Sequence, residues 1–63
     1  MNMSEEEEHQ QILLPREAAL YLRIAESTLR RWVKSGRLKS VRLGRCVRIA
    51  RSDLDRFIEA NRS

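Results

Sequence analysis

The chain has 63 residues, enough for one small domain, so we expect no separate catalytic or effector domain. Its single cysteine, Cys46, excludes an internal disulfide and a cysteine-rich zinc site, and no stretch approaches the roughly 20 apolar residues of a membrane span. Thirteen basic and nine acidic residues give a formal charge of +4, and without a signal-like apolar run we expect a cytoplasmic protein.

Residues 1–11 are polar and acidic, with four consecutive glutamates at positions 5–8 and no apolar periodicity. This composition predicts a disordered acidic tail, followed by a folded domain over residues 12–63. We interpret the glutamate run as a solubilising arm, and the alternative is that it competes with phosphate for the basic residues. The lone His9 lies in this tail, where we expect no metal site.

A first helix is predicted to begin at Pro15, because proline suits the first helical position, and to run through Leu22. Glu17 lies in its first turn, where a negative charge complements the helix dipole. The small alanines of this segment allow another helix to approach closely. A tight turn over residues 23–25 then leads to the next helix.

Residues 26–36 predict a second, amphipathic helix. Leu29, Trp32 and Val33 recur at the i, i+3 and i+4 spacing of a buried stripe, so Trp32 is expected to pack in the core rather than to stack on a base. Gly36 is expected to end the helix, because glycine adopts a positive φ without a Cβ penalty. The opposite face is polar and cationic, with Ser27, Arg30, Arg31 and Lys34.

The pattern changes to a period of two after residue 38, which predicts a β-hairpin. A three-residue loop over residues 44–46 would pair Leu43 with Val47 and bring all the apolar hairpin residues to one face. A two-residue turn would place the apolar residues of the two strands on opposite faces, so we expect the three-residue loop. The apolar residues concerned are Val41, Leu43, Val47 and Ile49.

The three-residue loop also determines where the hairpin arginines lie. It places Arg45 at the tip and Arg42 opposite Arg48 on the outer face. Like charges that face each other destabilise a strand pair, so we expect a phosphate to bind between or near these two arginines. The alternative is that both side chains splay into water.

Residues 52–61 predict a third helix. Ser52 is expected to cap it, and two aspartates in its first turn complement the helix dipole. Leu54, Phe57 and Ile58 form the predicted buried stripe. Because the outer residues are largely acidic, we expect this helix to brace the domain rather than to face a polyanion.

The residue types present do not favour catalysis. The only histidine lies in the tail, so no Ser-His-Asp or Cys-His set is available, and two glycines are too few for a phosphate-binding loop. We therefore expect no enzyme, no cofactor and no small-molecule ligand. Residues 23–51 instead hold ten basic residues and one acidic residue, which favours nucleic acid as the partner over an anionic membrane surface.

Two helices, a hairpin and a bracing helix outline a winged helix-turn-helix, an α+β fold whose second helix enters the major groove of double-stranded DNA. Arginine pairs bidentately with guanine, and an arginine at a hairpin tip suits a narrow minor groove. The predicted contacts of the second helix are Ser27, Thr28, Arg30, Arg31 and Lys34. The predicted wing contacts are Arg42, Arg45 and Arg48, and the candidate phosphate contacts are Arg23 and Lys39.

Three runs carry a family resemblance: L-L-P-R-E-A-A-L-Y-L-R-I-A-E-S-T-L-R-R-W-V-K-S-G-R-L, V-R-L-G-R-C-V-R-I and S-D-L-D-R-F-I. Over residues 13–59 they resemble the excisionase-type DNA-binding domain, a MerR-like winged helix. The resemblance implies a non-catalytic recombination directionality factor of a phage or other mobile element. Such a factor binds attachment-site DNA cooperatively, bends it, and directs an integrase, a tyrosine or serine recombinase, toward excision. At matching positions the resemblance implies base contacts from Ser27 and Arg31 and a wing contact from Arg45.

Three residues depart from the pattern of that family. Leu14 stands where a helix-capping Ser or Thr is usual, Arg23 replaces a turn glycine, and Ala25 replaces the second helix cap. We expect Ser27 or the Glu26 carboxylate to substitute in part for this second cap. Two other functions stay open, a small transcriptional regulator of a phage or plasmid and an RNA- or protein-binding adaptor.

Overall fold

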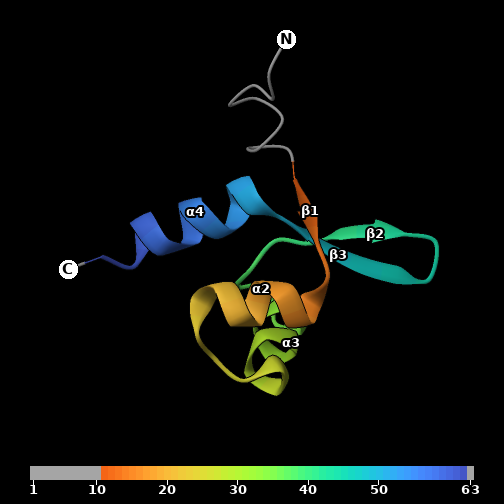
Figure 1. Cartoon of the computed structure of the whole chain (residues 1–63), viewed down its shortest axis with the longest axis horizontal. Coiled ribbons are helices and arrows are strands. Elements are labelled where there is room, and N and C mark those ends of the chain that lie inside the picture. The colour runs from red at the N-terminus through yellow and green to blue at the C-terminus, as the bar shows by residue number, and fades with distance from the viewer. Residues whose placement is uncertain (1–10, 63) are drawn as a thin grey trace, which may run out of the picture.

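The computed structural model describes residues 11–62, so the predicted acidic tail lies outside the described residues apart from Gln11. The described elements are β1 (Ile12–Leu13), α2 (Pro15–Leu22), α3 (Glu26–Lys34), β2 (Val41–Leu43), β3 (Cys46–Ala50) and α4 (Arg51–Ala60). Figure 1 shows α2 and α3 packed together, with the β2–β3 hairpin and α4 extending to opposite sides. The fold is α+β and is that of a small winged helix-turn-helix, as predicted.

The described strands form one antiparallel sheet in the order β1-β3-β2. The β2–β3 hairpin is as predicted, but β1 is an addition to the predicted fold. This strand has only two residues, and its Leu13 lies opposite Ile49 of β3. The Arg51 N–H donates to the carbonyl oxygen of Gln11 over 2.9 Å and so extends the pairing. As a result, β1 fixes the start of α2 beside β3.

The register of the hairpin differs from the predicted one. A two-residue turn over residues 44–45 replaces the three-residue loop, and Leu43 pairs with Cys46 instead of Val47. Gly44 has a φ of 65°, and a glycine at the first turn position is the type II′ pattern, whose twist matches that of paired strands. The turn chemistry of Gly44 therefore overrides the apolar alternation on which the prediction was based.

This register separates the apolar residues of the two strands. Val47 packs toward the core, whereas Val41 and Leu43 lie on the other face, where Val41 pairs with Arg48. The predicted pairing of Arg42 with Arg48 is therefore also wrong, because Arg42 lies opposite Val47. The helices and β3 already fill the core, which leaves Leu43 55% exposed.

The core is small and lies between the helices and β3. Its fully buried large side chains come from three elements and are Leu29, Ile49 and Leu54. Trp32 packs against this cluster, and its ring centroid lies 5.2 Å from that of Phe57, which confirms the predicted core role of Trp32. Because α3 is anchored through this stripe, its opposite face is left free for contacts.

Local residues explain the ends of α2 and α3. Glu17 Oε1 accepts a hydrogen bond from the Leu14 N–H over 2.8 Å, although the apolar Leu14 side chain offers no cap in return. Arg23 ends α2 in the left-handed conformation, with a φ of 60°, which costs a non-glycine residue roughly 1–2 kcal/mol. Gly36 follows α3 with a φ of 85°, as predicted.

Three details of the predicted helices are wrong. No side chain caps α3 at Ala25, because the Glu26 carboxylate bonds to an arginine within the helix instead. β3 leads directly into α4, so Ser52 lies inside the first turn of α4 rather than at its cap. Ile58 of α4 is 38% exposed and does not belong to the buried stripe. None of the helices within residues 11–62 is long and apolar enough to cross a membrane.

Candidate nucleic-acid interface

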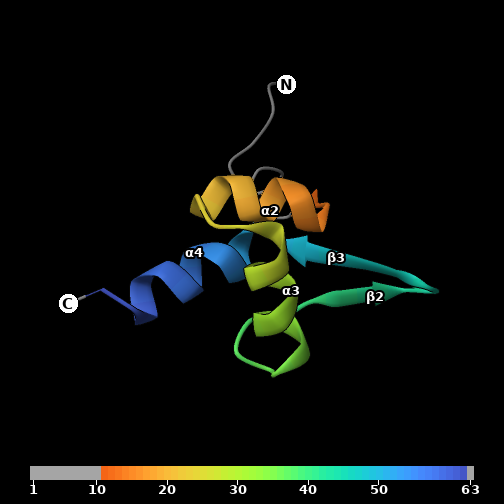
Figure 2. The same ribbon diagram turned by 90° about the horizontal axis from the view of Figure 1, so that it is seen from below.

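α3 carries its polar residues on the face turned away from the core. Figure 2 shows this helix from below, with α4 on one side of it and the β2–β3 hairpin on the other. Ser27, Arg31 and Lys34 are exposed, at positions opposite the buried stripe. Thr28 is half-buried and lies on the same side of the helix as Trp32. α3 therefore presents one hydroxyl and two cations directly outward.

Two adjoining hollows lie between α3 and the hairpin, and together they are called the basic groove. Pro15, Arg30 and Val47 border both hollows. The first is lined further by Leu14, Arg16, Glu26, Arg45 and Arg48. The second is lined further by Leu29, Val33, Lys34, Ser40, Arg42 and Ile49. Among these described lining residues six are basic and only Glu26 is acidic, so the groove is suited to a polyanion.

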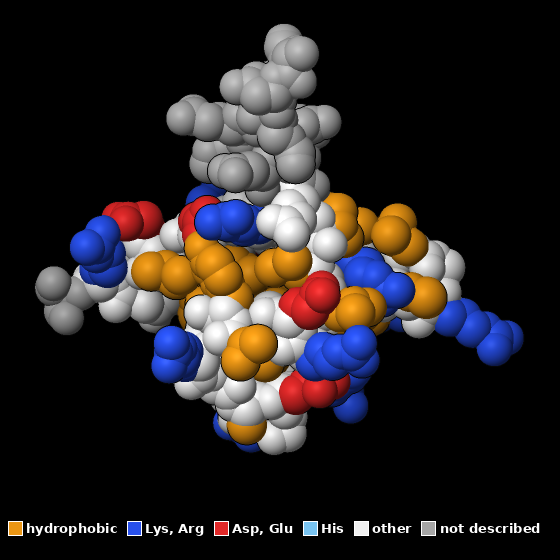
Figure 3. Space-filling view, in the orientation of Figure 1, with side chains coloured by type: hydrophobic (Ala, Val, Ile, Leu, Met, Phe, Trp, Pro, Cys, Tyr) orange, Lys and Arg blue, Asp and Glu red, His pale blue; other side chains and the backbone are white. Residues whose placement is uncertain are grey.

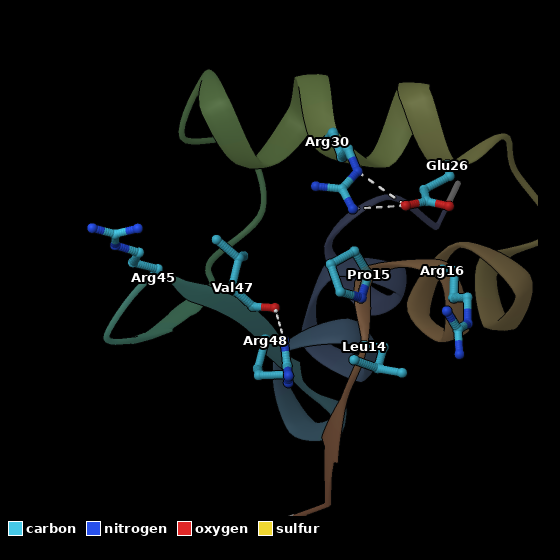
Figure 4. A pocket seen from close by; sticks show the side chains of 8 residues that line it. All are labelled: Leu14, Pro15, Arg16, Glu26, Arg30, Arg45, Val47 and Arg48. Atoms are coloured by element: carbon cyan, nitrogen blue, oxygen red, sulfur yellow. Dashed lines mark hydrogen bonds and ion pairs between the residues drawn. The ribbon is translucent and has the colours of Figure 1, made fainter.

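Arg30 extends from α3 into the first hollow, where Figure 4 shows it between Arg45 at one end and Arg16 at the other. Its Nε and Nη2 atoms donate to one carboxylate oxygen of Glu26, over 3.0 and 2.8 Å. The two side chains are 60% and 43% exposed, so the pair stabilises the fold by less than about 1 kcal/mol. Arg30 can therefore exchange Glu26 for a base or a phosphate at little cost.

The hairpin contributes three arginines to the basic groove. Arg42 of β2 lines the second hollow and lies opposite Val47. Arg45 occupies the two-residue turn and is exposed. Arg48 is half-buried, and its Nη1 atom donates to the carbonyl oxygen of Val47 over 2.9 Å, which holds the side chain against the strand. The structure thus brings all three predicted wing residues together with Arg30.

The arrangement is a pair of helices joined by a short turn, with an exposed cationic face on the second helix and a basic hairpin beside it. The sequence model of the helix-turn-helix domain family matches residues 13–62. The chain belongs to the helix-turn-helix domain family. Membership supports binding to double-stranded DNA, with α2 and α3 as the helix-turn-helix unit. A search of curated proteins finds no match to the chain.

Two predicted phosphate contacts lie apart from the basic groove of this helix-turn-helix domain. Arg23 occupies the turn between α2 and α3. Lys39 borders a separate hollow beside α4, together with Arg37 and Asp53. No three His, Cys, Asp or Glu side chains within residues 11–62 form a group that could hold a metal ion.

Arg16 is a groove residue of the helix-turn-helix domain that the sequence analysis does not assign. It follows Pro15 in the first turn of α2 and lines the first hollow with Arg30. The pairing of β1 with β3 helps to bring this end of α2 beside the hairpin, and the sequence does not predict β1. The sequence feature that could have predicted the position of Arg16 is Pro15, which marks the start of α2. Arg16 therefore lies in the first turn, at the positive end of the helix dipole.

Proposed function

We propose that the protein is a sequence-selective double-stranded DNA-binding protein that places α3 in the major groove and the β2–β3 hairpin in the adjacent minor groove. The observation that carries the proposal is the basic groove, which joins the cations of α3 to the hairpin arginines within a helix-turn-helix domain. The major groove, about 12 Å wide, admits a helix, and a hairpin-tip arginine suits the narrow minor groove. The phosphates between the two DNA grooves then face Lys34, Arg42 and Arg48 of the basic groove.

The exposed face of α3 supplies the proposed base contacts. Ser27 and Arg31 lie on this face, and Arg30 joins them once its ion pair opens. Arg45 enters the minor groove from the hairpin turn. The proposed phosphate contacts come from Thr28, Lys34, Arg42 and Arg48, and further along the duplex from Arg23 and Lys39.

We also propose the role of an excisionase-type recombination directionality factor. The resemblance over residues 13–59 and the winged helix-turn-helix fold support this role. The protein would bind attachment-site DNA cooperatively, bend it and direct a tyrosine or serine integrase toward excision, on the nucleoid of a bacterial cell or phage-infected host. A domain of this size offers a small interface, which favours cooperative assembly on DNA over a stable dimer in solution.

A selection from random duplexes at physiological salt tests DNA binding, sequence preference and site spacing together. We expect one preferred motif, bound far more tightly than random DNA. Footprinting on the natural locus then tests the biological role. Closely spaced direct sites beside a recombination core are the expected result, whereas a single palindrome at a promoter would favour a transcriptional regulator. Absence of duplex binding even at low salt would contradict the proposal and favour an RNA- or protein-binding adaptor.

A further inference from the structure

The hairpin carries an apolar face that the rest of the domain does not cover. Because the turn has two residues, Leu43 and Cys46 lie opposite each other and point away from Val47, which packs toward the core. Leu43 is 55% exposed and Cys46 is exposed as well. Figure 3 shows apolar side chains along the hairpin, interspersed with basic ones. The end of the hairpin is therefore both apolar and cationic.

A single exposed leucine is common on protein surfaces, so the position of Leu43 is what matters. It directly precedes the turn that carries Arg45, and Arg42 precedes it on the same strand. Leu20, on α2, is even more exposed at 75%, but its hollow is bordered by a single arginine, Arg51, together with the acidic Glu17. Among the exposed large apolar residues within positions 11–62, Leu43 is the one that lies on the hairpin, within two positions of Arg42 and Arg45.

The minor groove of DNA has the matching chemistry, because its walls are deoxyribose rings and its edges are phosphates. It is only about 6 Å wide, whereas two paired strands are already about 4.8 Å apart before side chains are added. A hairpin end with a leucine on one face cannot enter unless the groove widens. Apolar side chains that enter the minor groove in other proteins insert between base steps, partly unstack them and bend the duplex toward the major groove, which opens the minor groove.

We propose that Leu43 enters the minor groove beside Arg45, packs against the deoxyribose wall and bends the duplex. This inference rests on the proposed double-stranded DNA binding and names the residue that couples binding to bending. Arg42 lies on the hairpin face toward α3, so it meets the phosphates between the major and minor grooves. Leu43 lies on the opposite face and meets the far wall of the minor groove.

The test compares Leu43→Ala with the matched control Leu20→Ala on the single-site duplex isolated by the random selection. Affinity is measured by fluorescence anisotropy, and bending by energy transfer between dyes at the two duplex ends. Truncation of a buried leucine should weaken binding about tenfold, which corresponds to about 1.4 kcal/mol, and should reduce the bend. Leu20→Ala should bind and bend as the unchanged protein does. Far-UV circular dichroism checks that both variants are folded.

The outcomes separate this inference from the proposed function. Failure of the unchanged protein to bind any duplex overturns both. Binding and bending by Leu43→Ala equal to those of Leu20→Ala overturns the inference alone. If Leu43→Ala loses affinity or bending only on a duplex with two adjacent sites, the inference is also overturned, because Leu43 would then contact a second copy of the chain. Weaker binding with an unchanged bend overturns it as well, since the leucine would then be a passive contact.

Discussion

The acidic residue in the basic groove leads to a specific prediction for Glu26→Gln. Glu26 holds Arg30 through two hydrogen bonds to one carboxylate oxygen, and it is the acidic residue among the described groove-lining side chains. The substitution removes the negative charge and keeps the size of the side chain. We expect the variant to bind random duplex DNA more tightly and to discriminate less between sequences, because Arg30 becomes available to any phosphate.

The size of the effect follows from the contacts. One additional phosphate contact steepens the dependence of log K on log salt by about 0.9, which is up to about eightfold in affinity at 0.1 M salt. The lost ion pair is largely exposed and costs the fold roughly 0.3–0.5 kcal/mol, and the lost charge at the start of α3 costs a similar amount. The melting temperature should therefore fall by no more than about 4–8 °C.

Glu59→Gln is the matched control, because Glu59 pairs with Arg62 over 2.7 Å on α4, away from the basic groove. It changes the net charge of the protein by the same amount. Anisotropy titrations of both variants on random and selected duplexes, over a range of salt concentrations, give the affinities and the slopes. If Glu59→Gln steepens the salt dependence as much as Glu26→Gln does, the effect is one of overall charge and the reasoning from the groove fails.

Three other predictions concern specificity and stability. Arg31→Ala should weaken binding to the selected duplex about 10- to 100-fold more than binding to random DNA, and equal losses on both DNAs would refute its base contact. Arg42→Ala should weaken binding to both DNAs alike and reduce the slope of log K against log salt concentration by about 0.9. Arg23→Gly should raise the melting temperature by roughly 2–4 °C, because the left-handed φ of 60° suits glycine, and an unchanged or lower value would show that the turn is not strained. Leu29→Ala should lower the free energy of unfolding by about 2–5 kcal/mol, because Leu29 is fully buried. A domain of this size has a total stability of roughly 3–5 kcal/mol, so the variant should lose most of its helical circular dichroism. A cooperative melt near that of the unchanged protein would refute this.

The helix-turn-helix unit could be predicted from the sequence because its signals are local. Pro15 marks the start of α2, the Leu29 and Trp32 spacing marks the buried stripe of α3, and Gly36 marks its end. Each of these depends on residues within one or two helical turns. β1 has no such signal, since two residues become a strand only through pairing with β3, more than thirty positions away. Ser52 misleads for a related reason, because β3 passes directly into α4 and the residue at the helix cap is Ala50, two positions earlier.

The candidate site could be predicted residue by residue but not as an arrangement. The basic residues of α3 and the hairpin are evident from composition and spacing. The contribution of Arg16 depends on how α2 packs beside β3, and the ion pair of Arg30 depends on the rotamer that it adopts. The spacing of residues along the sequence predicts neither this packing nor this rotamer. Charge patterning therefore predicts which residues are basic and exposed better than it predicts which of them pair with an acidic side chain of the same protein.

The wrong hairpin register is informative about function. The prediction assumed that every apolar strand residue faces the core, and Leu43 breaks this assumption because the glycine turn directs it to the solvent. An apolar residue that stays exposed, with no contact in the fold that accounts for it, often marks a site where a binding partner covers it. Leu43 lies between arginines at the point of the hairpin proposed to enter DNA, so its exposure in the free protein is what a bending contact in the complex requires.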